Sequence, residues 1–301
     1  VNLMQPNFTE QLLAAEYNLS INSDQLYVND FEDLVPNLPT IQTPLTIEFT
    51  AEGNTDSLFV DRAIFGMDES VLNINGQLRN LQSSKQFGYS MRLDRLYLEN
   101  TELQQFFGFD STSSYNRVNN VSASGTAEGS ADSLSLDVGL QSPNGGLQIK
   151  GGTRLQAPFR YRATLSGTNL DVSPFWAASL DTTALNINAE LEGQGVTLEE
   201  ATSRFRATLA NSRVNDIVFD SMALNTSLAN GRWQQEYDYR NGDERLQGAG
   251  SVDFSRAEPP VAVKGRAQNI NLAKLFGDWG VAESKLNFNY NLEMQGLEPN
   301  R

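Results

Sequence analysis

A stretch of nine residues that occurs twice is the feature that most constrains the fold of this 301-residue chain. Thr50–Leu58 returns as Thr126–Leu134, and seven of the nine positions are identical. Each copy ends a strand-like run and contains an acidic turn with a glycine. A second pair of segments, residues 185–195 and 286–296, agrees at seven of eleven positions. Strand-and-turn segments that recur in this way indicate a repeat protein, whose fold is interpreted from its unit.

Tyrosines mark the start of the unit. Tyr17, Tyr89 and Tyr161 each open a strand-like run, and they are separated by 89 − 17 = 72 and 161 − 89 = 72 residues. A further run of the same kind begins near Val261. We therefore predict a lead-in followed by three full repeats and a partial fourth, over residues 1–16, 17–88, 89–160, 161–260 and 261–301.

Each of these opening runs is followed by a short segment with helical character. Asp171, Ser173 and Pro174 have the order that is typical of a helix start, with proline in the first turn. Segments of one or two turns are too short to be stable without packing against other elements. We expect short helices at the unit junctions, against the sheet, over residues 31–35, 102–107, 174–180 and 272–276.

Most of the remaining chain alternates between apolar and polar residues, as in Leu134–Leu140. A period of two predicts antiparallel strands with one apolar face. Asn230-Gly231 and Asn241-Gly242 are typical hairpin turns. We also interpret Gly145-Gly146 and Gly151-Gly152 as turns.

The predicted helices are too few and too short to cover this apolar face. Soluble proteins rarely expose a large contiguous apolar patch, so something must shield it. The sheet can pack on a second sheet, close into a solenoid with its own core, or stay open as a groove for an apolar ligand. A hydrophobic content of only 39% weighs against the first two solutions without excluding them.

Composition excludes several classes of function. The formal net charge of −15 argues against a nucleic-acid partner, because lysine and arginine supply the affinity for phosphate backbones. The chain has no cysteine and no histidine, which removes disulfides, thiolate metal sites and the commonest general base. The carboxylate pairs Glu52/Asp56 and Glu199/Glu200 fall at predicted turns. We therefore expect neither catalysis nor a metal or cofactor.

Five segments in the third predicted repeat and their order resemble the AsmA-like superfamily, and within it the TamB-like (translocation and assembly module) repeat region. These segments pair strand ends with glycine-containing turns, and the likeness extends more loosely over most of residues 17–301. The five segments are Leu170–Trp176, Leu191–Glu200, Ala210–Ile217, Leu224–Gly231 and Gly248–Phe254.

The resemblance implies a long curved antiparallel β-sheet groove, called a β-taco. In the family this groove belongs to an inner-membrane-anchored protein, spans the periplasm of a diderm bacterium and holds phospholipid acyl chains on their way to the outer membrane. An outer-membrane barrel protein is an implied partner. Complete members begin with a membrane helix, whereas this sequence begins at Val1 without one, so we expect it to be a piece of a longer protein.

We therefore predict a non-enzymatic periplasmic segment that conducts phospholipids along an apolar groove. The main alternative is a structural or adhesive β-solenoid of the cell surface with a sealed core, and a more distant one is a carbohydrate-active protein. Asn186 and Asn188 should face solvent. The groove should be lined by Ile47, Phe49, Leu72, Ile74, Leu136, Val138, Leu185, Ile187, Phe205, Leu209, Met222, Leu224, Phe288, Tyr290 and Leu292.

Overall fold

The computed structural model describes residues 15–27, 43–102, 118–175, 181–198, 200–215, 217–256, 258–271, 273 and 283–296. Within these ranges the chain forms sixteen β-strands in an open antiparallel sheet, and the order of the strands is their order in the sequence. The predicted all-β class with an antiparallel repeat sheet is confirmed. The chain divides into two compact units, residues 1–144 and 145–301, which are described separately.

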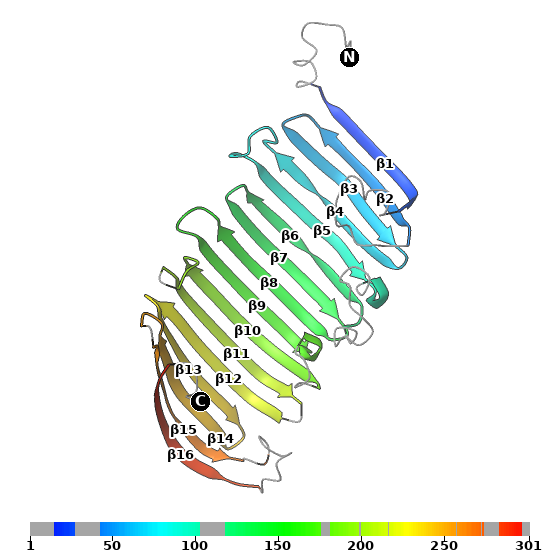
Figure 1. The fold of residues 1–301 in the computed structure, drawn as a ribbon. Coiled ribbons are helices and arrows are strands. Elements are labelled where there is room, and N and C mark those ends of the chain that lie inside the picture. Colours follow the sequence, from blue (N-terminus) through cyan, green and yellow to red (C-terminus); the bar gives the residue numbers. More distant parts are fainter. Residues whose placement is uncertain are drawn as a thin grey trace. The chain divides into compact units, whose positions relative to one another are not determined.

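The described residues of the first unit form seven strands, each antiparallel to the one before it (Figure 1). A long connection separates β1 from β2 and β5 from β6, residues 80–87 join β4 to β5, and the other strands are joined by short turns. The strands are β1 (Tyr17–Leu26), β2 (Leu45–Gly53), β3 (Ser57–Met67), β4 (Ser70–Arg79), β5 (Gly88–Leu98), β6 (Val121–Ser130) and β7 (Ser133–Ser142).

In its described ranges the second unit forms nine strands with the same antiparallel order, and β15 and β16 are visibly bowed (Figure 1). Its long connections follow β9 and β15. The strands are β8 (Gly145–Arg154), β9 (Arg160–Leu170), β10 (Thr183–Gln194), β11 (Thr202–Val214), β12 (Ile217–Ala229), β13 (Arg232–Asn241), β14 (Glu244–Asp253), β15 (Pro260–Ile270) and β16 (Leu286–Gln295).

The regularly spaced tyrosines occupy equivalent places in this order. They lie at the beginning of β1, β5 and β9, and each stands directly opposite a glycine near the end of the next strand. In the pairs of Tyr89 and Tyr161 the ring lies across the glycine, where a side chain would collide with it. A Cβ on Gly129 would be 2.8 Å from the Tyr89 hydroxyl, and one on Gly193 would be 2.6 Å from that of Tyr161. The pairs are Tyr17/Gly53, Tyr89/Gly129 and Tyr161/Gly193.

Most predicted turns are where the sequence indicated. Both copies of the nine-residue repeat form hairpins, β2/β3 and β6/β7. Asn230 and Gly231 have φ values of 52° and 70°, as the type I′ turn between β12 and β13 requires. The turn predicted at Gly145-Gly146 lies just before these glycines, at residues 143–144, and both glycines begin β8. The turn predicted at Gly151-Gly152 is wrong, because both residues lie inside β8. A Cβ at Gly151 would be 3.0 Å from the Arg162 carbonyl oxygen of β9, so this glycine serves a close approach of two strands.

One pair of equivalent side chains closes two of the long connections. Asp171 Oδ1 accepts hydrogen bonds from the backbone N–H of Ser173 (3.0 Å) and Thr183 (3.1 Å) and from the Thr183 hydroxyl (3.0 Å). Asn271 Oδ1 accepts bonds from the N–H of Ala273 (3.1 Å) and of Ser284 (3.2 Å) after β15. Each side chain therefore binds the residue two positions ahead of it and the far end of the same connection.

The repeat of residues 185–195 at 286–296 has its own structural role. Asn169 and Asn269 have positive φ values of 49° and 52° and lie where the register shifts in β9 and β15. The N–H of Asn169 donates to Oδ1 of Asn186 and the N–H of Asn269 to Oδ1 of Asn287, both at 3.0 Å. The repeated asparagine thus holds a β-bulge in the preceding strand. Asn186 is half buried rather than free in solvent, whereas Asn188 is exposed as expected.

The described helical residues follow the first strand of a predicted repeat. Residues 100–102 are helical after β5, and Ser173–Phe175 forms a 3₁₀ turn after β9, so the predicted helix start is confirmed there. The other residues of the predicted helical segments, apart from Ala273, lie outside the described ranges. In the part of the chain that the structure describes, no helix has the length and apolarity needed to cross a membrane.

Replacement of Asp171 tests its role in closing the connection between β9 and β10. Asp171→Ala removes three hydrogen bonds from backbone and hydroxyl donors, so we expect the free energy of unfolding to fall by about 1–3 kcal/mol. Asp171→Asn keeps the acceptor oxygen that Asn271 uses in the equivalent place and should cost less than half as much. Urea unfolding of both variants measures the difference. Equal losses would contradict the role of the acceptor oxygen.

Candidate functional site

Strand register divides the first unit into an apolar and a polar face. Directly opposite residues of neighbouring strands share a face. One row across β1–β7 consists of Ile21, Phe49, Ala63, Ile74, Leu93, Gly125 and Val138. On the other face, the row across β4–β7 consists of Asn75, Arg92, Thr126 and Asp137. We call the first of these two surfaces the apolar face of the unit.

The second unit has the same division. The apolar face includes one continuous row across β8–β16, and the polar row beside it alternates in charge over several strands. The apolar row consists of Ile149, Leu165, Ala189, Ala207, Leu224, Tyr237, Gly248, Gly265 and Tyr290. The polar row consists of Lys150, Thr164, Glu190, Arg206, Asn225, Glu236, Ala249, Lys264 and Asn291.

All fifteen residues predicted to line a groove lie on the apolar face of their unit. The register brings together Ile47, Phe49, Leu72, Ile74, Leu136 and Val138 in the first unit. In the second it brings together Leu185, Ile187, Phe205, Leu209, Met222, Leu224, Phe288, Tyr290 and Leu292. Contact of these residues with lipid stays a prediction.

The apolar faces are half covered rather than sealed. None of the fifteen residues is buried, and Phe288 and Leu292 on β16 are 46% and 51% exposed. The largest fully buried side chains of the described residues are only Pro174, Ser173 and Ser212. A core between two sheets would instead bury leucine and phenylalanine completely. In the described ranges, the apolar side chains are therefore covered mainly by their own neighbours on the sheet.

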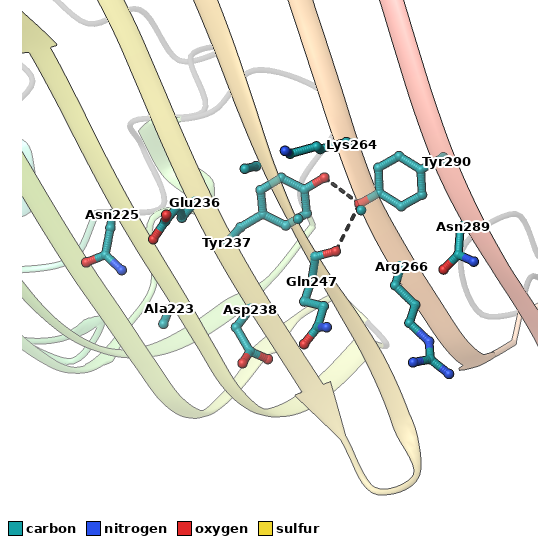
Figure 2. A pocket seen from close by; sticks show the side chains of 13 residues that line it. Ala223, Asn225, Glu236, Tyr237, Asp238, Gln247, Lys264, Arg266, Asn289 and Tyr290 are labelled. Carbon is teal, nitrogen blue, oxygen red and sulfur yellow. Dashed lines mark hydrogen bonds between the residues drawn. The ribbon is translucent and has the colours of Figure 1, made fainter.

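A pair of tyrosines lies flat on the apolar face of the second unit. The hydroxyls of Tyr237 on β13 and Tyr290 on β16 are 2.5 Å apart, and Tyr290 also donates to the Gln247 carbonyl oxygen at 3.4 Å (Figure 2). The rings reach each other across Gly248 and Gly265, where a Cβ would be 2.6 and 2.2 Å from a hydroxyl oxygen. Partial burial, with the hydrogen bond to Tyr237 second, raises the pKa of the Tyr290 hydroxyl.

The polar face of the second unit contains shallow hollows between long side chains. One of them has a volume of about 580 Å³ and lies over β12–β16, with Glu236, Asp238 and Lys264 among its residues (Figure 2). Hydrogen bonding to Arg240, and more weakly to Arg245, holds the pKa of the Asp238 carboxyl below its usual range. An ionised, ion-paired carboxylate is unsuited to act as a general acid. Among the described residues no cluster of three acidic side chains could hold a metal ion.

The comparisons with known proteins give no relative. No protein-family model, no curated protein and no solved structure matches this chain.

Several apolar-face residues were not in the predicted set. Leu19 and Ile21 on β1 are 45% and 52% exposed, and Leu191 on β10 is 36% exposed. Leu19 and Ile21 alternate with polar residues in the first predicted strand, so the same period of two could have identified them. The pairing of tyrosines with glycines had no such local signal, because the glycines are 32 to 40 residues further along the chain.

The tyrosine pair predicts sensitivity to alkali. A raised pKa means that the folded state binds the Tyr290 proton more tightly than the unfolded state does. This contribution to stability is complete below the unfolded-state pKa near 10 and is lost as the pH rises above it. The thermal unfolding midpoint of Tyr290→Phe should therefore fall less between pH 9 and pH 11 than that of the wild type. Tyr161→Phe, which removes a hydroxyl outside this pair, is the control and should behave as the wild type.

Proposed function

We propose that the protein is a non-enzymatic lipid conduit, whose apolar face holds the acyl chains of phospholipids. The observation that supports this most directly is the gathering of most apolar side chains on one half-exposed face of each unit and of most polar side chains on the other. The polar face keeps the sheet in water. The apolar face needs an apolar partner, because exposed apolar surfaces of this extent mark binding sites.

Acyl chains suit such a surface physically. A hydrocarbon chain has no polar atoms to satisfy, so it requires only a continuous dry surface without directional contacts. Each methylene group that leaves water contributes about 0.8 kcal/mol. A long chain is then bound firmly as a whole, while every step of one methylene along the surface replaces one contact by a similar one. Binding and movement along the sheet are compatible.

The setting that we propose is the periplasm of a diderm bacterium. The resemblance to AsmA-like and TamB-like proteins supports a segment between an inner-membrane anchor and the outer membrane, with phospholipid as cargo and an outer-membrane barrel protein as partner. A protein of net charge −15 is also poorly suited to bind an anionic membrane surface or a nucleic acid directly.

The competing function is a self-sealed spacer of the cell surface. A spacer would bury its own apolar side chains and would need no ligand. The half exposure of the apolar side chains on interior strands, such as Ile187 on β10 and Leu224 on β12, favours the conduit.

Native mass spectrometry of the purified protein, combined with extraction of bound lipid, tests the proposal. We expect phospholipid to co-purify in a near-constant ratio to protein. A protein mass without lipid, together with no uptake of a fluorescent phospholipid, would support the spacer instead.

Charged substitutions on the apolar face provide the second test. Ile187→Asp and Phe205→Asp place a carboxylate where acyl chains would lie, so phospholipid binding should weaken at least about tenfold, which corresponds to about 1.4 kcal/mol. Both side chains are only half buried, so the circular dichroism spectrum should stay that of the wild type.

Neighbouring residues of the polar face give matched controls. Asn188→Asp and Thr208→Asp introduce the same charge on exposed positions of the same strands, β10 and β11. Asn188→Asp also retains the oxygen that accepts a hydrogen bond from the Ser166 hydroxyl at 2.8 Å. Loss of lipid binding in these controls to the same degree would refute the assignment of the faces.

A further inference from the structure

The hairpin between β8 and β9 places two arginines face to face. Arg154 is the last residue of β8 and Arg160 the first of β9, and the register sets them directly opposite each other. Both side chains are exposed, and neither forms an ion pair with a carboxylate of a described residue. Like charges at directly opposite positions of a sheet repel each other, so this arrangement favours a bound anion between them.

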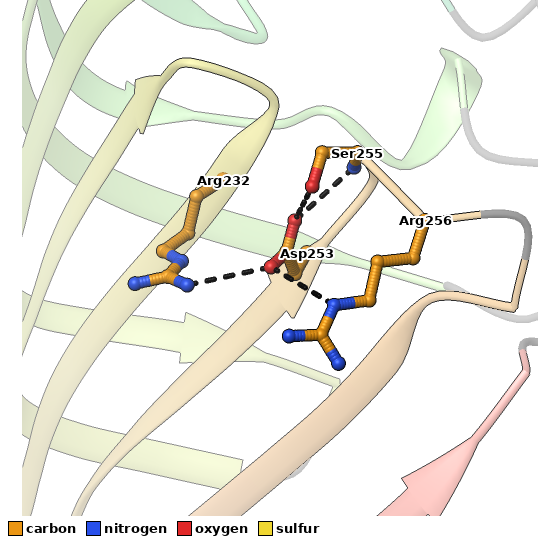
Figure 3. Close-up of polar contacts among 4 residues, drawn as sticks. All are labelled: Arg232, Asp253, Ser255 and Arg256. Atoms are coloured by element: carbon orange, nitrogen blue, oxygen red, sulfur yellow. Dashed lines mark hydrogen bonds and ion pairs between the residues drawn. The ribbon is translucent and has the colours of Figure 1, made fainter.

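The β8/β9 hairpin lies at one end of the strands, which we call the margin of the sheet. Arginines near the other hairpins of this margin are neutralised by carboxylates within the protein. Arg232 and Arg256 both approach the carboxylate of Asp253, at 3.3 and 3.8 Å (Figure 3). Arg204 at the start of β11 lies 3.7 Å from Glu192 of β10. The arginine pair of the β8/β9 hairpin lacks such a carboxylate in the described part of the chain.

The same hairpin adjoins the apolar face through an aromatic pair. Phe159 and Tyr161 flank Arg160 in sequence, and their ring centroids are 5.8 Å apart. Tyr161 lies on the apolar face across Gly193. Its hydroxyl has no hydrogen-bond partner among the described residues. Arginine and tyrosine therefore emerge from opposite faces at the same strand end, within one residue of the margin of the sheet.

We propose that this margin is a phosphate subsite for a phospholipid, whose acyl chains lie on the adjoining apolar face. The inference rests on the proposed lipid-binding function. The planar guanidinium groups of Arg154 and Arg160 are suited to bind two oxygens of one phosphate, and they exchange their mutual repulsion for attraction to it. The ring of Tyr161 contacts the acyl chains, and its hydroxyl donates to the ester or phosphate oxygens. The polar head of the lipid then points to the margin of the sheet at the β8/β9 hairpin.

A similar set of residues recurs in the first unit, 72 residues earlier for the aromatic pair. Phe87 and Tyr89 have ring centroids 6.1 Å apart, and Tyr89 lies across Gly129. Arg79, the last residue of β4, and Lys85, in the connection from β4 to β5, are exposed and form no ion pair with a described carboxylate. Each of the two units thus has a set of cationic and aromatic residues at its margin.

Two lipids with identical acyl chains separate the phosphate subsite from the apolar face. Dioleoylphosphatidylglycerol has a phosphate group and dioleoylglycerol lacks one, and both are tested in acyl-labelled fluorescent form with the whole chain. Arg154→Gln/Arg160→Gln should lower the affinity for the phosphate lipid about five- to tenfold, as loss of two exposed charge-assisted contacts implies. The affinity for dioleoylglycerol should stay within about twofold of wild type, because that lipid makes no contact through a phosphate.

The double variant Arg206→Gln/Arg213→Gln is the matched control. It removes the same charge from exposed arginines of β11 in the same unit, and we expect the wild-type affinity for both lipids. An unchanged affinity of the Arg154→Gln/Arg160→Gln protein for the phosphate lipid would overturn the subsite. Equal losses for both lipids would overturn it as well, because they would indicate damage to the apolar face.

Inorganic phosphate distinguishes a lipid head from a free anion. Competition by inorganic phosphate at a concentration comparable to that of the phospholipid would indicate a free-anion site and overturn the inference. If the wild type binds neither lipid, the proposed function itself fails. If it binds both lipids equally and the arginine variant does too, only the phosphate subsite fails.

Discussion

The register between neighbouring strands is the constraint on which both faces of each unit depend. Side chains alternate between the faces with a period of two, so a slip of one residue would bring the whole apolar set of a strand to the polar face. In a protein with a sealed core, such a slip would be opposed by large buried side chains. Here most large side chains of the apolar faces are only half buried, and many of the buried apolar residues are alanines, so the penalty for a slip is smaller. Local contacts must therefore fix the register.

Three kinds of contact fulfil this role. Asn186 and Asn287 accept hydrogen bonds from the backbone of a bulge in the preceding strand. Asp171 and Asn271 close the long connections that follow two of these bulges. Tyrosine rings that lie across glycines of a neighbouring strand permit only one partner at that position, because any other residue would introduce a Cβ into the ring. All three link particular positions of two strands, and so oppose sliding directly.

The sequence alone could predict the strands, the faces and most turns, because each depends on neighbouring residues. The alternation of Leu134, Leu136 and Val138 is visible within one strand. The hydrogen bonds that Asp171 and Asn186 accept from distant residues could not be predicted, since their donors become close only in the folded sheet. The prediction of a turn at Gly151-Gly152 was wrong for a related reason. Without a partner strand in view, a glycine that allows close approach looks the same as one that permits a turn.

The half-buried face has a thermodynamic consequence for the role of a ligand. Folding of this chain transfers less apolar surface out of water than folding into a sealed core would, so the ladder hydrogen bonds and the local contacts bear a larger share of the stability. An acyl chain on the apolar face adds the missing burial and binds only to the folded sheet. Such a ligand stabilises the folded state by mass action, increasingly as its concentration exceeds the dissociation constant. The same open surface that limits the stability of the empty sheet thus couples the stability of the loaded sheet to its cargo.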